Sequence, residues 1–162
     1  MCRHNKTFQG CWIVVLLLSA VLIVPVRAQS SPPNAPEKII IDTDIGDDVD
    51  DAFAIALALR SPELQILGIS TAFGDTATRA KLLDRFLGEV GRSEIPVAVG
   101  APTHATNVFT QRRYAENGRF VRPAHPNAVD FILEQIRQYP GQITLVAIGP
   151  LMNVGALIDQ DP

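Results

Sequence analysis

The chain has 162 residues, a formal net charge of −3 and two cysteines, and these properties exclude several classes of protein. An acidic chain binds the phosphate backbone poorly, so we expect no nucleic-acid partner. Both cysteines, Cys2 and Cys11, precede the first predicted strand, so no disulfide framework and no thiol nucleophile are expected in the domain.

The N-terminus has the pattern of an export signal. Arg3 and Lys6 precede an apolar stretch from Trp12 to Val24, and the sequence VRA ends at Ala28 with small residues at the cleavage positions. The apolar stretch is short for a membrane span, although an uncleaved anchor stays open. We therefore predict a signal peptide at residues 1–28 and a periplasmic or secreted protein with no membrane contact after cleavage.

Cleavage would make the mature protein more acidic. Residues 1–28 contain three basic residues and no acidic one, so their removal changes the formal charge from −3 to −6. Residues 29–37, QSSPPNAPE, are rich in Pro and Ser and predict an extended linker. The folded domain is expected to span residues 38–162.

From Lys38 onward, short apolar runs alternate with helical patterns. In chain order we predict a strand at 38–41, a helix at 50–60, a strand at 64–71, a helix at 76–92, a strand at 95–100, a long polar segment at 101–123, a helix at 125–140 with Pro126 near its start, a strand at 142–149 and the opening of a helix at 150–158. This alternation predicts an α/β fold, a mostly parallel, Rossmann-like sheet with helices on both faces.

Two of the predicted helices carry further expectations. The helix at 50–60 is apolar nearly all round, which predicts a buried helix whose residues Phe53, Ile55, Leu57 and Leu59 belong to the core rather than to a cofactor site. The last helix has only just begun when the chain ends at Pro162. We therefore expect a truncated chain.

Six aspartates crowd together directly after the first predicted strand. They are Asp42, Asp44, Asp47, Asp48, Asp50 and Asp51. Helix capping accounts for one or two acids at a helix start. It does not account for Asp42 and Asp44, which end a buried strand where an unpaired charge is costly. Several carboxylates at one point predict a hard cation such as Ca²⁺ or Mg²⁺.

Three motifs in the chain resemble one known family. The sequences DTDIGDDVDDA, GISTAFGDT and TLVAIGPLMN follow the first, second and fourth predicted strands, and ligands of open α/β sheets bind beyond these strand ends. Together they resemble the calcium-dependent nucleoside hydrolases of the inosine-uridine preferring type. The resemblance covers residues 38–162, roughly the N-terminal half of such a domain. It implies hydrolysis of the N-glycosidic bond of ribonucleosides to free base and ribose, with a Ca²⁺-bound water.

The resemblance also implies roles for individual acids. Asp44 matches the general base and a calcium ligand, Asp51 a further calcium ligand, and the backbone carbonyl of Ile148 a main-chain calcium ligand. Asp50 matches an acceptor for a ribose hydroxyl. The usual motif, D-x-D-P-G-x-D-D-A, is longer by two residues here, so Asp48 is an alternative for a ligand role.

Other substrate contacts are less firmly matched. Asp75 stands where the family usually has an Asn that contacts ribose, and Asn153 is either a substrate ligand or a helix N-cap. The segment 101–123 is a candidate lid over the base. His104, Tyr114 and His125, in or beside it, are candidates for assisting the leaving base, although such residues are more often solvated.

Two other functions compete with the nucleoside hydrolase. A metal-dependent phosphatase of the haloacid dehalogenase type also has D-x-D after its first strand, but its motif continues with Thr or Val where this chain has Gly46. A non-catalytic sugar- or cation-binding module on the same fold is the second.

The expected partner is a small-molecule nucleoside. Assembly into a homo-oligomer is possible, and we expect the 162 residues alone to be inactive.

Overall fold

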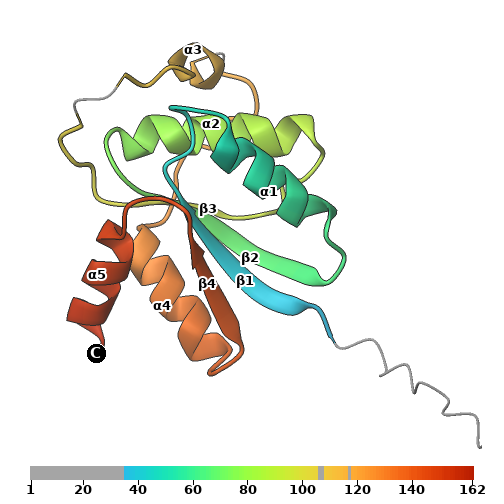
Figure 1. The fold of residues 1–162 in the computed structure, drawn as a ribbon, viewed down its shortest axis with the longest axis vertical. Helices are drawn as coiled ribbons and strands as arrows, with labels where there is room; N and C mark the ends of the chain where they lie inside the picture. Colours follow the sequence, from blue (N-terminus) through green and yellow to red (C-terminus); the bar gives the residue numbers. More distant parts are fainter. Residues whose placement is uncertain (1–34, 106–107, 117) are drawn as a thin grey trace, which may run out of the picture. The chain divides into compact units, whose positions relative to one another are not determined.

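The computed structural model describes residues 35–105, 108–116 and 118–162 (Figure 1). The predicted signal peptide and residues 29–34 of the predicted linker lie outside the described residues. In the described part of the chain, no helix is long and apolar enough to cross a membrane.

Four parallel strands form a single sheet. They are β1 (Glu37–Thr43), β2 (Leu64–Thr71), β3 (Val97–Val99) and β4 (Ile143–Ala147), in the spatial order β3-β2-β1-β4. All pairings are parallel, which confirms the predicted α/β fold. The chain extends the sheet from β1 in one direction through β2 and β3, and then returns to place β4 on the other side of β1. The strand order therefore reverses between β1 and β4, where open α/β sheets bind their ligands.

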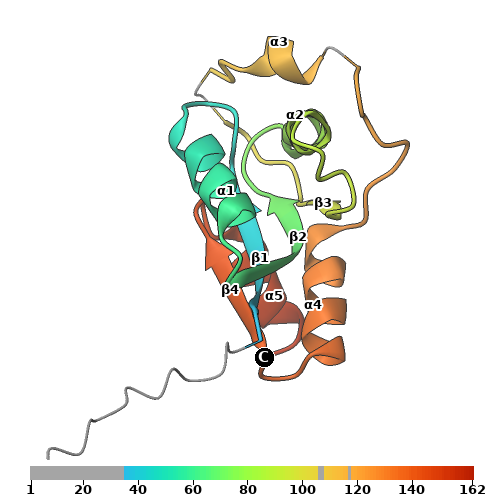
Figure 2. The ribbon, with the colours of Figure 1, turned by 90° about the vertical axis from the view of Figure 1, so that its right-hand side faces the viewer.

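Helices cover both faces of this sheet, as predicted (Figures 1 and 2). The helices are α1 (Asp50–Arg60), α2 (Thr76–Glu89), α3 (Arg112–Ala115), α4 (Ala128–Gln138) and α5 (Met152–Gln160). Ile39 and Ile41 of β1 belong to the core cluster that includes α1 and α2. Ile40, between them, belongs to the cluster that includes α4. Successive strand residues point to opposite faces, so a continuous apolar run serves both cores.

Several element boundaries differ from the prediction. β1 begins at Glu37, inside the predicted linker, and continues through Asp42 and Thr43, so the first acid of the cluster is a strand residue. β3 and β4 are shorter than predicted. α4 begins after Asn127, whose side chain accepts hydrogen bonds from two backbone N–H groups of the first turn, so Pro126 precedes the helix. The predicted polar segment contains the short helix α3.

The prediction that α1 is buried all round is wrong. Ile55 is fully buried and Leu59 packs against the core, but Phe53 is 72% exposed and Leu57 is 71% exposed. Each residue turns a helix by about 100°, so positions two apart lie on nearly opposite sides. The four residues that the sequence suggested as one core stripe therefore occupy two faces of α1, and only one face packs against the described domain.

Candidate active site

The acidic motif lies at the C-terminal edge of the sheet, beside the end of β4. We call residues 44–49, between β1 and α1, the acid loop. The backbone N–H of Ile148 donates to the carbonyl of Asp42 over 2.8 Å. A β-carbon placed on Gly149 would lie only 2.9 Å from Asp44 Oδ1. Thus β4 delivers Ile148 and Gly149 next to the acids, on the one edge where the strand ends were expected to meet.

Asp42 is a buried acid at the end of β1. Its Oδ1 accepts hydrogen bonds from Ser70 Oγ at 2.6 Å and from Asn153 Nδ2 at 2.8 Å. Its Oδ2 has no hydrogen-bond partner among the described residues. Burial raises the pKa of Asp42 above its usual value, although the two hydrogen bonds act in the opposite direction. An unpartnered buried carboxylate oxygen is an acceptor that a donor or a cation would satisfy.

Asp44 and Asp51 are the two acids that the fold brings together. Asp51 is buried in the first turn of α1, and its Oδ2 accepts a hydrogen bond from Thr43 Oγ1 at 2.5 Å. The pKa of Asp51 is raised to about 6, mainly because the group is buried; the Thr43 hydrogen bond opposes this rise and the charge of Asp44 adds to it. Burial also raises the pKa of Asp44, against the charge of Arg79 and a side-chain hydrogen bond with Asp51.

Asp48 and Asp50 lie outside this pair, on the exposed side of the motif. The interaction between their neighbouring carboxyl groups raises the pKa of Asp48 and lowers that of Asp50. Asp50 Oδ1 also accepts from the backbone N–H of Asp51 at 2.9 Å. An exposed Asp50 is accessible to a hydroxyl group of a bound molecule. The metal-ligand role of Asp48 and the ribose role of Asp50 stay predictions.

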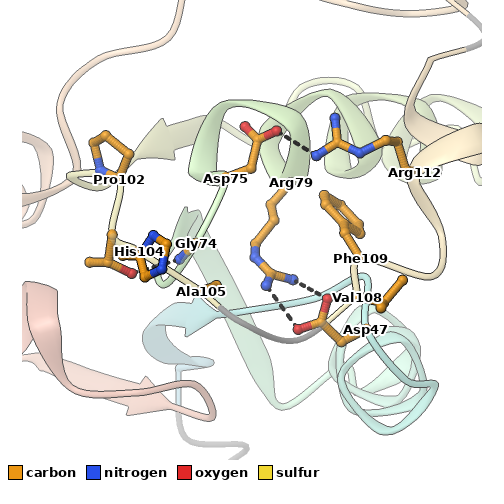
Figure 3. A pocket seen from close by; sticks show the side chains of 11 residues that line it. Asp47, Gly74, Asp75, Arg79, Pro102, His104, Ala105, Val108, Phe109 and Arg112 are labelled. Carbon is orange, nitrogen blue, oxygen red and sulfur yellow. Dashed lines mark hydrogen bonds and ion pairs between the residues drawn. The ribbon is translucent and has the colours of Figure 1, made fainter.

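Asp75 is the N-cap of α2. Its carboxylate accepts hydrogen bonds from the backbone N–H of Thr78 at 3.0 Å and from the Thr78 hydroxyl at 2.7 Å. It also forms an ion pair of 2.8 Å with Arg112 (Figure 3). Partial burial raises the pKa of Asp75, but the hydrogen bonds of Thr78 and Arg112 outweigh it and the net shift is downward. Substrate binding by Asp75 stays a prediction, and it would share these oxygens.

Asn153 is not an N-cap. It lies inside α5, whose N-cap is Leu151, and its side chain is buried. The two hydrogens of its Nδ2 go to Asp42 Oδ1 at 2.8 Å and to the carbonyl of Thr71 at 3.0 Å. This geometry makes Asn153 a support for Asp42. Contact between Asn153 and a substrate stays a prediction.

A cavity of about 590 Å³ opens beside the acid loop (Figure 3). Its walls include Asp47 and Arg79 on one side, Asp75 on another, and the described residues 102–105 and 108–109, among them His104. Of the three candidates for assisting a leaving base, His104 alone lines this cavity. The Tyr114 hydroxyl donates to Glu89 Oε2 at 2.7 Å, and His125 Nε2 lies 2.9 Å from the buried carboxylate of Asp84.

The described residues supply part of a shell for a hard cation. No three Asp, Glu, His or Cys side chains in the described ranges converge as a ready metal cluster. The carboxyl groups of Asp44 and Asp51 nevertheless lie near enough to shift each other's pKa, and Ile148 and Gly149, which follow β4, lie beside Asp42 and Asp44. Calcium takes six to eight oxygen ligands. Two carboxylates and a main-chain carbonyl fit Ca²⁺ as a partial donor set.

Sequence reasoning missed the residues that hold these acids in place. Thr43 and Ser70 are buried hydroxyl donors to Asp51 and Asp42. Thr43 is the last residue of β1 and Ser70 the next to last of β2. Small polar residues at the ends of strands that begin with apolar runs are a signal that the sequence offered. Arg79 is a buried cation next to the acid loop. Its position within an amphipathic helical pattern gave no sign of burial.

Comparison with known proteins agrees with this arrangement. The sequence model of the family described as inosine-uridine preferring nucleoside hydrolase matches residues 39–162. Probable uridine nucleosidase 2 of Arabidopsis thaliana is 40% identical over 144 residues, which cover 78% of this chain and 43% of that protein. Pyrimidine-specific ribonucleoside hydrolase RihA of Salmonella arizonae is 35% identical over 136 residues, which cover 76% and 43%.

Solved structures give the same family. A plant nucleoside hydrolase, PpNRh1, superposes with a TM-score of 0.64 at 33% identity, covering 78% of this chain and 44% of that one. A purine-preferring ribonucleoside hydrolase from Gardnerella vaginalis superposes with a TM-score of 0.62 at 25% identity, covering 77% and 44%. The chain thus spans less than half the length of these relatives. With a family match from residue 39 to residue 162, the chain belongs to the inosine-uridine preferring nucleoside hydrolase family.

Proposed function

We propose that the protein hydrolyses the N-glycosidic bond of ribonucleosides, releasing the free base and ribose with the help of Ca²⁺. The observation that carries this proposal is the pair of neighbouring carboxylates, Asp44 and Asp51, at the C-terminal edge of β1. Ile148 and Gly149, which follow β4, lie beside Asp42 and Asp44, so the Ile148 carbonyl is the proposed main-chain ligand. Relatives named nucleoside hydrolases support the reaction class.

Asp44 is the proposed general base. It is half-buried, and burial raises the pKa of its carboxyl group, which makes it a better proton acceptor than an exposed aspartate. Cleavage of the glycosidic bond passes through a sugar that is positive at the anomeric carbon. Nearby carboxylates stabilise that charge. Asp50, Asp75 and Asn153 are the proposed contacts to the ribose.

The proposed calcium ligands are Asp44, Asp51 and the carbonyl oxygen of Ile148, with Asp48 as an alternative side-chain ligand. A bound Ca²⁺ would lower the pKa of a coordinated water and fix its position. Asp44 and Asp51 would hold this ion with their carboxylates. Thr43 restricts Asp51 through its hydrogen bond, and Gly149, after β4, restricts Asp44 by close packing.

Uridine is the substrate to test first. Two relatives carry names that specify uridine or pyrimidine ribonucleosides, whereas a structural neighbour is named purine-preferring. The side chains of this chain that would touch the base include His104, which lines the cavity beside the acid loop. A pyrimidine preference is therefore proposed from the relatives, and inosine is the matched purine control.

The test uses the full-length protein. It is incubated with uridine, inosine and p-nitrophenyl riboside, with and without a chelator of divalent ions. Riboside cleavage that the chelator abolishes supports the proposal. Calcium binding by titration calorimetry without turnover would instead support the non-catalytic module. The phosphatase is not favoured by the family match, and p-nitrophenyl phosphate is the substrate that checks it. The 162 residues alone are expected to give no turnover, because relatives are more than twice as long as the matched segment.

A further inference from the structure

Arg79 is a charged side chain in the interior of the domain. It lies in the first turn of α2 and is only 2% exposed. Burying a cation is costly unless it is paired and its N–H groups are hydrogen-bonded. The partners of its guanidinium group therefore indicate which parts of the structure depend on it.

The guanidinium group joins the loop after β2 to the acid loop. Its Nε donates to the carbonyl of Phe73 at 2.8 Å, and its Nη1 donates to the carbonyl of Ile45 at 2.8 Å and to that of Asp44. Its Nη2 forms an ion pair of 3.0 Å with Asp47 Oδ2 (Figure 3). One side chain thus holds the backbone of two consecutive residues, the first of which is the proposed general base.

The same cluster anchors the segment that follows β3. The ring of Phe109 stacks on Arg79, with 4.9 Å between the guanidinium carbon and the ring centre. Phe109 also covers Gly46, where a β-carbon would come within 2.1 Å of the ring. The backbone N–H of Gln111 donates to the Gly46 carbonyl at 2.9 Å. The acid loop is therefore held between α2 and the segment 109–111.

We propose that Arg79 is a positioning residue for Asp44 and that Asp47 supplies the charge that keeps Arg79 in place. Arg79 fixes the Asp44 carbonyl, and Gly149 packs against the Asp44 backbone nitrogen and carboxylate. With its backbone restricted on both sides, Asp44 has little freedom other than that of its carboxyl group. The inference rests on the proposed function, because it assigns an orienting partner to the proposed base.

Replacing Arg79 by lysine tests whether the shape of the guanidinium group matters apart from its positive charge. Arg79→Lys keeps a cation at the site, but a single ammonium group cannot reproduce a planar fork with five donors. Asp47→Asn is the second variant, and it leaves Arg79 in place without its counter-charge. Arg85→Lys is the matched control, since Arg85 also lies on α2 and pairs with Glu89 and the Tyr114 carbonyl, neither of which is in the acid loop.

The first measurement is hydrogen exchange of the metal-free protein. We expect Arg79→Lys to accelerate backbone exchange at residues 44–48, Asp47→Asn to do so more weakly, and Arg85→Lys to leave these residues unchanged. Unchanged exchange at residues 44–48 in a folded Arg79→Lys variant would overturn the inference. If Arg79→Lys does not fold, the same criterion applies to Asp47→Asn.

The second measurement is uridine hydrolysis by the full-length protein and its variants. A misplacement of about 1 Å near a reacting group costs on the order of 100-fold in rate, so we expect kcat of Arg79→Lys to fall by about that factor while KM changes by less than about threefold. A purely structural role would lower the folded fraction and leave kcat per folded molecule unchanged, which overturns the inference. If the wild type itself cleaves no ribonucleoside, the proposed function fails, and hydrogen exchange at residues 44–48 decides the inference alone.

Discussion

Gly149 packs directly against Asp44. A β-carbon at Gly149 would lie 2.8 Å from the Asp44 backbone nitrogen and 2.9 Å from its Oδ1. Contact with a backbone atom cannot be relieved by rotating a side chain. We therefore expect Gly149→Ala to displace Asp44 and to weaken both calcium binding and turnover. Overpacking of this kind costs about 1–3 kcal/mol of unfolding free energy, which urea denaturation measures.

Gly155→Ala is the matched control for that variant. Gly155 lies in α5, and a β-carbon there would meet nothing within 4 Å. Alanine favours a helix over glycine by roughly 0.5–1 kcal/mol, so this variant should be slightly more stable than the wild type. Equal effects of the two substitutions would show that the contact between Gly149 and Asp44 has no special importance.

Asp44→Asn tests the proposed base directly. The substitution keeps the size of the side chain but removes its basicity and one negative charge beside Asp51. General-base catalysis contributes about 100- to 10,000-fold to the rate, so kcat for uridine should fall by about 100-fold or more. Calcium affinity, measured by calorimetry, should fall as well. Kinetics like those of the wild type, in a variant with an unchanged circular dichroism spectrum, would contradict the assignment.

The position of the acid cluster could be predicted from the sequence because it depends on topology. Alternation of strands and helices implies parallel strands, and parallel strands place their C-terminal ends on one edge. This argument correctly brought Asp44 to the same edge as Ile148. It needed no knowledge of side-chain contacts. The end of the first strand was predicted too early: the predicted strand stops at residue 41, whereas β1 continues through Asp42 and Thr43.

Other features could not be predicted because they depend on contacts between distant residues. The composition of α1 suggested burial on all sides, yet Phe53 and Leu57 have no covering element in the described structure. Asp75 matched a substrate contact by position, a role that stays a prediction, and the sequence did not reveal that its oxygens accept from Thr78 and Arg112. Arg79 had the pattern of a helix-surface residue. Its burial follows from the Asp47 carboxylate and the backbone carbonyls around it, which only the fold brings near.

Asn153 supports a buried acid, and removing it should destabilise the domain. Asn153→Ala leaves Asp42 Oδ1 with only the Ser70 hydroxyl, and it leaves the Thr71 carbonyl with only the Gly100 N–H. Loss of a hydrogen bond to a charged group costs about 1.5–3 kcal/mol, and urea denaturation would measure this loss. Gln160→Ala is the control, because Gln160 is exposed on the same helix and should change stability by less than about 0.5 kcal/mol.

The predicted signal peptide has its own test. If the pattern from Arg3 to Ala28 is read as an export signal, the protein recovered from the exported fraction should begin at Gln29. Mass spectrometry of the intact protein measures this N-terminus. Recovery of a chain that still begins at Met1, associated with membranes, would instead support the uncleaved anchor.

Asp75 should make the stability of the domain depend on acid pH. Its pKa in the folded state is below the usual 3.8, so folding favours the charged carboxylate. The contribution of this carboxylate is therefore fully present above the pKa of the unfolded chain and is lost as pH falls through the lower pKa of the folded state. Asp75→Ala removes an N-cap and should cost about 1 kcal/mol near pH 7. Urea denaturation should show this difference shrinking as the pH is lowered below 3.8.

Asp75→Asn separates the cap from the charge. Asparagine is also a good N-cap, so it retains an acceptor for the Thr78 N–H but loses the ion pair with Arg112. This ion pair is half-exposed, and such pairs contribute about 0–1 kcal/mol, so the stability of Asp75→Asn should be nearer to that of the wild type than the stability of Asp75→Ala is.

The pH prediction for Asp75→Ala has a contradicting outcome. A stability difference between the wild type and Asp75→Ala that grows as the medium is acidified would mean that the protonated acid is the stabilising form. That result would contradict the hydrogen bonding in which the Asp75 carboxylate only accepts.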